Sequence, residues 1–214
     1  MNLSKAIEAR HTLKVLADPE SPWDLPDPCV KQKISELLAV ANNAPYHKPA
    51  DKSHLSGDLD SPVPWRFHVV DASNCRSLAA KLTQSEVQSG KIGNMLSAAD
   101  VLVMTTWLPN PSEQHAGFQE FEATLQNMEH IAAGSAAIQN FLLLATAAQW
   151  NNYWSSGGVL RSEMVYQWLK IPPAQVLLGA IFLFPADTRG VDVKPGGLRD
   201  RKGDANQWSR WAEL

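Results

Sequence analysis

The feature that most constrains the fold is a long segment, residues 112–148, whose second half is small and apolar around its whole circumference. That half reads "AAGSAAIQNFLLLATAA". A helix that is apolar on every side is buried on every side. Because a chain of 214 residues has little interior to spare, we expect a long helix at the interface of a two-fold homodimer. The alternative is the buried central helix of a single subunit.

Composition narrows the class of protein. Hydrophobic residues make up 44% of the chain and charged residues 19%, which is typical of a folded domain. The net charge of −3 gives no general attraction to nucleic acid, so an anion site must be local. Cys29 and Cys75 lack a disulfide framework or metal-ligand neighbours, and we expect packed thiols. No apolar signal core or full membrane span is evident, which predicts a cytoplasmic protein that does not enter a membrane.

Hydrophobic periodicity places the secondary structure. Helices are expected over residues 3–10, 30–42, 74–89 (with Ser73 as the N-cap), 112–148 and 161–171. Strands are expected over 66–71, 100–107 and 174–185, and residues 151–158 are expected to form a short strand that leads into a Ser-Gly turn. Residues 43–65 form a long polar loop, a length typical of functional or mobile loops. Neither repeats nor an internal boundary are evident, so residues 1–214 form one domain. Interleaved helices and strands predict an α+β or α/β sandwich.

Motifs for self-sufficient catalysis are missing from the sequence. It contains no G-x-S-x-G, H-E-x-x-H, P-loop or G-x-G-x-x-G pattern, so the serines of "WSSGGVL" are poor candidates for a hydrolase nucleophile. A metal site in the long loop is an alternative that lacks a fixed ligand framework; its candidates are His47, Asp51, His54 and Asp58. His68 is expected to be structural, and His130 to be a satisfied histidine at the subunit interface.

Two clusters of anion-binding side chains stand near opposite ends of the chain: Arg10, His11, Thr12 and Lys14 in "EARHTLKVL", and Arg199, Arg201 and Lys202 in "LRDRKG". A phosphate held between them would receive charge-assisted hydrogen bonds from both. The alternative is that the first cluster is a solvated helix end. Together with the glycine turn of "SSGG", these residues suit a cofactor that has a phosphate and a flat ring and brings its own chemistry.

Several segments, in this order, resemble the FMN-dependent nitroreductase family: "AIEARHTLKVL", "ANNAPYHK" with "PVPWRFHVV", "AAIQNFLLLATAAQWNNYWSSGG", "LKIPPAQVLLGAIFLFP" and "LRDRKG". Each motif is weak alone, and the ordered set is fairly specific. The resemblance narrows the fold to the α+β class, as a nitroreductase-like α/β sandwich in which helices flank a mixed central sheet, and implies an intertwined homodimer. It also implies FMN at the interface, bound from both subunits, with residues 186–214 as an extension that embraces the partner.

The resemblance also assigns roles to individual positions. By this resemblance, Arg10, His11 and Thr12 would bind the phosphate. Arg199 and Arg201 would also contact it, with Lys202 nearby. Lys14 would stabilise the negative charge of reduced flavin at its pyrimidine edge. Trp154 and Ser155 would line one flavin face, and the backbone N–H groups of Ser156 and Gly157 would face N5 and O4. Ser61 replaces the family's asparagine in N-x-Q-P-W, followed by Val63 for glutamine and then by Pro64 and Trp65.

The activity implied is that of an FMN oxidoreductase. NADH or NADPH gives a hydride to FMN N5 and leaves, and a small organic acceptor (nitroaromatic, quinone, enone or flavin) then takes the electrons. No side chain is needed as a general acid or base. The altered loop leaves two alternatives: a flavin-binding carrier or sensor with little turnover, and a relative that performs other flavin chemistry, such as dehalogenation or FMN breakdown.

Overall fold

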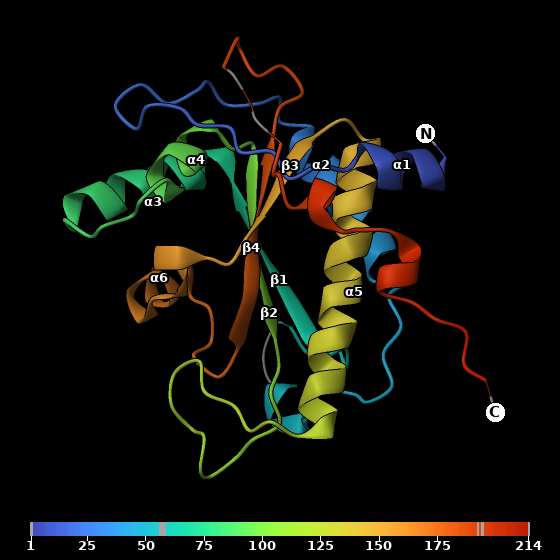
Figure 1. Ribbon diagram of the computed structural model, residues 1–214. Helices are drawn as coiled ribbons and strands as arrows, with labels where there is room; N and C mark the ends of the chain where they lie inside the picture. Colours follow the sequence, from blue (N-terminus) through green and yellow to red (C-terminus); the bar gives the residue numbers. More distant parts are fainter. Residues whose placement is uncertain (1, 56–58, 192, 194, 214) are drawn as a thin grey trace.

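A four-stranded sheet forms the centre of the computed structural model, which describes residues 2–55, 59–191, 193 and 195–213 (Figure 1). The elements follow in the order α1 (Leu3–Ala9), α2 (Val30–Ala41), β1 (Trp65–Asp71), α3 (Ala72–Gln84), α4 (Ile92–Ala98), β2 (Val101–Trp107), α5 (Leu125–Ala147), β3 (Asn151–Ser155), α6 (Glu163–Leu169) and β4 (Val176–Phe184). Short 3-10 turns cover Lys52–His54, Gly158–Arg161, Arg199–Arg201 and Ala205–Gln207. The α+β class is therefore confirmed.

The sheet has the order β1-β2-β4-β3, and each neighbouring pair is antiparallel. This corrects the expected mixed sheet. Parallel pairing among the described residues is limited to an isolated bridge between Thr12 and Asn152, which attaches the amino-terminal segment to β3. β2 and β4 lie in the middle, are mostly apolar and are buried along almost their whole length, because helices cover both faces.

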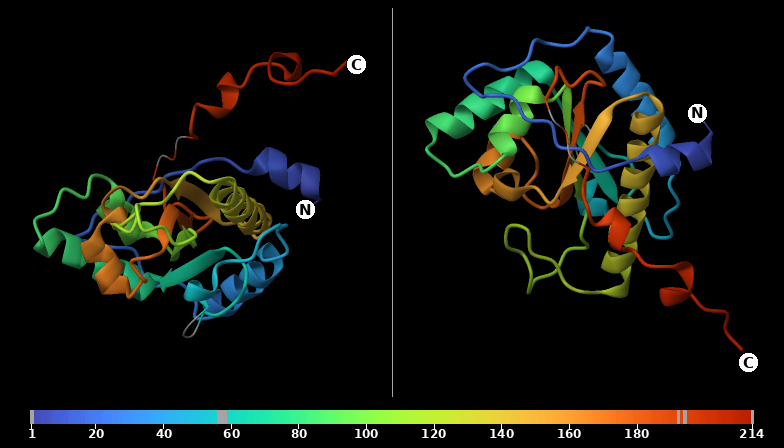
Figure 2. Two further views of the ribbon diagram at one scale, coloured as in Figure 1. Left: turned by 90° about the horizontal axis from the view of Figure 1, so that it is seen from below. Right: turned by 45° about the horizontal axis from the view of Figure 1, so that its top comes forward.

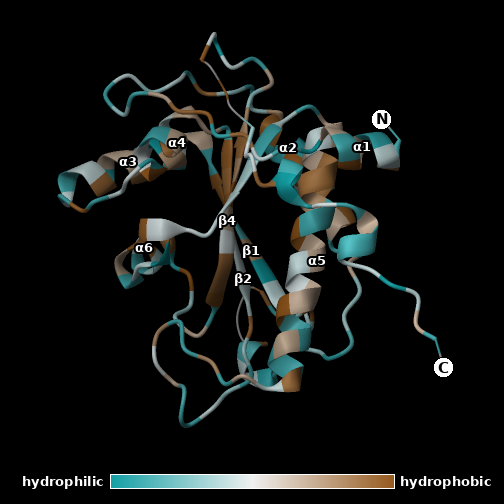
Figure 3. Ribbon diagram, in the orientation of Figure 1, coloured by the Kyte–Doolittle hydropathy of each residue, from teal (hydrophilic) through white to brown (hydrophobic). Residues whose placement is uncertain are grey.

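Helix α5 and helix α2 cover one face of the sheet, and α3, α4 and α6 cover the other (Figure 3). On the first face, Ile138, Phe141 and Ala145 of α5 are fully buried against Ile181 and Leu183 of β4. α5 is long and apolar enough to cross a membrane by composition, and in this fold one side of it is buried against the sheet.

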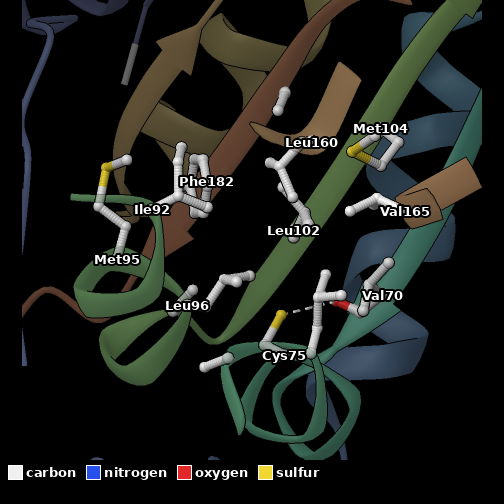
Figure 4. Packing of buried hydrophobic residues seen from close by; sticks show 14 of the residues in the cluster. Val70, Cys75, Ile92, Met95, Leu96, Leu102, Met104, Leu160, Val165 and Phe182 are labelled. Carbon is white, nitrogen blue, oxygen red and sulfur yellow. Dashed lines mark hydrogen bonds between the residues drawn. The ribbon is translucent and has the colours of Figure 1, made fainter. Parts of the chain in front are cut away.

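The second face is closed by the cluster drawn in Figure 4, where Cys75 lies beside Val70 and Leu102. Burial raises the pKa of the Cys75 thiol to about 12, so it is an inert packing group as expected. Cys29 is exposed, so only one of the two cysteines is packed.

Several helix boundaries differ from the expectation, and at the start of α5 and of α3 the N-cap explains the difference. α5 begins at Leu125 instead of near residue 112, because the Thr124 side chain caps it by accepting a hydrogen bond from the Asn127 N–H at 3.2 Å. α3 is capped by Asp71, which accepts from the Asn74 N–H at 2.9 Å, and not by Ser73. Residues 92–98, for which the sequence predicted no element, form α4.

Truncating the fully buried Phe141 tests the role of α5. Phe141→Ala is expected to lower the free energy of unfolding by about 3–5 kcal/mol, because the substitution leaves a cavity between α5 and the sheet. Urea denaturation measures the loss, with Gln139→Ala on the exposed side of the same helix as the matched control. Equal effects of the two substitutions would contradict this packing.

Candidate functional site

The two cationic ends of the chain meet at the edge of β3. The Leu13 N–H donates to the Asn152 carbonyl at 2.9 Å, and the Gly196 N–H donates to the Thr12 carbonyl at 2.9 Å. A Cβ at Gly196 would lie only 3.2 Å from Thr12 Cβ, so glycine permits this close approach. The tail then passes near α1 and α5 before it leaves the body of the protein (Figure 2). Segment 10–13 is thus held between β3 and residues 195–199.

Arg10 and Arg199 are the centre of this junction. Arg199 donates from its guanidinium to the Arg10 carbonyl and, at 3.4 Å, to the Ile7 carbonyl. Burial and, secondarily, the charge of Arg199 lower the pKa of Arg10. No carboxylate among the described residues forms an ion pair with either guanidinium. Two like charges without a counter-ion favour binding of an anion.

The other residues predicted to bind an anion differ in their burial and in the contacts that they make. His11 and Thr12 are half-buried beside Arg10. The Lys14 ammonium lies 4.7 Å from the Tyr153 ring centroid, within cation–π range. Arg201 and Lys202 are exposed, and in the described part of the chain their side chains make no recorded hydrogen bond or ion pair.

Lys14 and Trp154 lie on opposite faces of the sheet. Tyr153, beneath Lys14, pairs with Phe182 on the α6 side, whereas Trp154 pairs with Ile181 on the α5 side. Trp154 is 37% exposed, and its indole lies across Gly179, where a Cβ would collide with the indole nitrogen. The two side chains expected to meet one flavin therefore flank the edge of β3 instead of sharing a surface.

The turn after β3 depends on Gly157, whose φ of +110° is open mainly to glycine. The Gly157 N–H donates to Ser155 Oγ at 3.1 Å. The Ser155 side chain is buried and folds back onto the turn, so this N–H is already satisfied within the chain. Ser156 is exposed.

Arg161, Gln119 and Tyr166 join this turn although the sequence did not single them out. Arg161 Nε donates to the Ser156 carbonyl at 2.6 Å, and its Nη1 donates to Gln119 Oε1 at 3.2 Å. Gln119 Nε2 donates to the Tyr166 hydroxyl at 2.8 Å. Burial lowers the pKa of Arg161 and raises that of Tyr166 to about 12. The one feature of the sequence that could have indicated this contact is a lone arginine, four residues after Gly157.

Ser61, Pro64 and Trp65 lie away from the arginine pair. The Ser61 carbonyl accepts from Arg66 Nη2 at 2.8 Å, while Pro64 and Trp65 are buried. Trp65 packs near Gly134 of α5, whereas α1 lies along residues 140–147 of the same helix. Six to thirteen residues of helix correspond to about 9–20 Å. Within one chain, the segment 61–65 and the arginine pair therefore do not lie together.

The histidines support structural roles. Among the described residues, no group of metal-ligating side chains assembles; Asp58 lies outside those residues. His54 Nε2 lies 2.7 Å from the Pro109 carbonyl, and His68 Nε2 lies 2.7 Å from Gln175 Oε1. His130 Nδ1 lies 2.9 Å from the Leu108 carbonyl, but its buried Nε2 has no partner in the described chain, so the expected satisfaction is only half achieved.

Removing the Arg161 guanidinium tests the support of the glycine turn. Arg161→Gln is expected to cost about 1–3 kcal/mol in the free energy of unfolding, because the Ser156 carbonyl loses its charged donor. Urea denaturation is the measurement, and Arg210→Gln in the exposed tail is the control. A loss no larger than that of the control would show that the contacts with Ser156 and Gln119 are unimportant.

Comparison with known proteins gives a fold match without close sequence relatives. No protein-family model matches the chain, and no curated protein matches it. A nitroreductase-like family protein from Bacillus cereus aligns with a TM-score of 0.59 at 17% identity, over 95% of this chain and 96% of that one. A nitroreductase with bound FMN from Bacteroides fragilis gives 0.59 at 15% identity, over 99% and 100%.

A nitroreductase family protein from Clostridium novyi gives a TM-score of 0.56 at 14% identity, over 86% of each chain. The alignments span nearly the full length of the Bacillus and Bacteroides proteins, and thus include both ends of the chain. The chain therefore has the nitroreductase-like fold.

Proposed function

We propose that this protein is an FMN-dependent oxidoreductase of the nitroreductase type. The observation that carries the proposal is the junction of Arg10 and Arg199: the Arg199 guanidinium donates to the Arg10 backbone carbonyl, and its charge helps to lower the pKa of Arg10. Neither guanidinium forms an ion pair with a carboxylate of the described residues, on a fold whose solved neighbour from Bacteroides fragilis holds FMN. The dianionic phosphate of FMN would supply the missing negative charge.

The remaining residues of the junction suit the rest of the cofactor. The Thr12 hydroxyl and His11 stand next to Arg10 for further phosphate contacts, and the C-terminal cations Arg201 and Lys202 add local positive potential. Lys14 supplies a positive charge that stabilises a reduced, anionic ring. FMN, when bound, supplies the hydride-accepting and hydride-donating chemistry.

The protein's own contribution is positioning and exclusion of water. The rigid edge of β3 and the arginine-braced turn hold fixed backbone groups, and Trp154 provides an exposed aromatic surface. No side chain is required to act as a general acid or base. NADH or NADPH is the proposed reductant, and a nitroaromatic, quinone, enone or flavin is the proposed acceptor, in a cytoplasmic enzyme.

A homodimer would complete the site. The outward side of α5 exposes Leu125, Met128 and Ala132, an apolar surface next to small residues. The Ser61–Trp65 segment is separated from the arginine pair within one chain, and a second copy related by a two-fold axis can present it across the interface. Residues 186–214 would then reach the partner.

A flavin carrier with little turnover is the second candidate. It is favoured by the Gly157 N–H, which donates to Ser155 Oγ and thereby removes one expected flavin contact. Serine at position 61, where the family has asparagine, also favours the carrier.

The visible spectrum followed by anaerobic addition of NADH or NADPH tests the proposed function. We expect a yellow protein whose flavin bleaches with the nicotinamide. Flavin that is bound but not bleached would support the carrier. A protein that stays colourless after incubation with FMN would overturn both.

The double variant Arg10→Ala/Arg199→Ala is expected to weaken FMN binding at least about a hundredfold, since each charged hydrogen bond contributes about 1.5–3 kcal/mol. Fluorescence titration of FMN measures this loss. The matched double control Arg189→Ala/Arg210→Ala removes two exposed arginines elsewhere. Retention of flavin by the first variant would show that the phosphate lies elsewhere.

Light scattering tests the assembly. A dimer is expected at micromolar protein, and Ala132→Glu on the outward side of α5 is expected to shift it toward monomer, because a carboxylate would be buried without a partner. Ala80→Glu, at an exposed position of α3, should leave the dimer intact. A wild-type monomer would contradict the interface.

A further inference from the structure

We propose that a cavity separate from the Arg10–Arg199 junction binds a small amine with an apolar body. The cavity has a volume of about 510 Å³ and lies between α2, the loop that precedes it, and the ends of β1 and β2. Its wall includes Leu25, Ile34, Leu38, Val69, Asp71 and Asp100. None of the arginine-junction residues lines it.

The size and wall of the cavity suit an organic molecule. Its volume falls within the range of about 300–1,000 Å³ found for small-molecule pockets. Leu25 is 60% exposed and Val69 is 45% exposed, although both are large apolar side chains. A bound apolar group would remove this surface from water, which is favourable.

The charged groups of the wall favour a cation. Three carboxylates, from Asp27, Asp71 and Asp100, face one ammonium, from Lys31. Lys31 Nζ lies 2.7 Å from Asp71 Oδ2 and is neutralised by it. Asp27 is engaged as an acceptor for the Cys29 N–H at 2.8 Å. Asp27 is also exposed to solvent, so Asp100 is the one carboxylate of the three that is both nearly buried and without an ion pair.

Asp100 is nearly buried, at 8% exposure. Its Oδ2 accepts from the Trp150 indole N–H at 3.1 Å, while no donor to its Oδ1 is found among the described residues. Desolvation by burial raises the pKa of Asp100, because the charged carboxylate lacks sufficient compensation. Oδ1 is not among the fully buried polar atoms that lack a partner, so an ammonium in the cavity would replace water as its donor and would add the opposite charge.

The two nearby guanidiniums do not supply that donor. Arg76 and Arg189 both act on Asp100 through their charge, yet neither lines the cavity. Arg76 directs Nε and Nη1 to the backbone carbonyls of Trp23, Leu96 and Ala99. Arg189 Nη1 lies 3.2 Å from Asp24 Oδ2. Among the residues that line the cavity, three carboxylates therefore still face one ammonium.

Three probes of matched shape test the proposal: 2-phenylethylamine, 2-phenylethanol and 3-phenylpropionate, titrated into the ¹⁵N-labelled full-length chain at neutral pH. We expect saturable shifts of the backbone amides of α2 and the end of β1 with the amine. The amine should bind at least about tenfold more tightly than the alcohol, as a charge-assisted hydrogen bond predicts. The carboxylate should bind least. Equal binding of the three probes, or no binding of the amine, would overturn the proposal.

Two variants locate the binding. Asp100→Asn keeps the shape and should remove the preference for the amine, whereas Asp187→Asn, at an exposed acid outside the cavity, should keep it. Val69→Phe narrows the cavity from an exposed position and should abolish binding, with Val87→Phe as its control. If Asp100→Asn fails to fold, Val69→Phe decides. Amine binding that survives Val69→Phe would place the amine elsewhere.

Discussion

Burial of α5 against β2 and β4 is the contact on which the rest of the structure depends. Phe141 and Ile138 close one face of the sheet, and the continuously apolar strands beneath them are possible only because the opposite face is closed as well. This packing fixes β3 at the sheet edge immediately after α5. The edge in turn receives segment 10–13, so the location of the arginine pair follows from the position of one helix.

The local patterns that the sequence predicted well are those in which one periodicity dominates. The apolar face of residues 30–41 and the buried strands near 101–107 and 176–184 appear as expected. The relative directions of the strands could not be predicted from the sequence, because a strand buried on both faces has the same apolar pattern in parallel and antiparallel sheets. The start of α5 was missed because polar residues before Thr124 also fit a helix, and the cap decides the boundary.

In the candidate site too, the sequence predicted the local clusters of residues but not the contacts that depend on the tertiary structure. The two cationic clusters were predicted, and the structure brings Arg10 and Arg199 together. The brace on the glycine turn was not predictable, because Gln119 comes from a distant loop and has a φ of 62° that no periodicity reveals. Similarly, the separation of Lys14 from Trp154 depends on which side of β3 each residue faces, and that is set by the register with β4.

The meeting of the two ends of the chain also has a consequence for biosynthesis. Segment 10–14 leaves the ribosome early, whereas residues 195–199 follow about 180 residues later, on the order of 10–40 s at ordinary elongation rates. The buried members of both large core clusters end at Phe184. A nascent chain can therefore complete its core before Arg199 is made, and the junction between Arg10 and Arg199 forms only once nearly the whole chain has been synthesised.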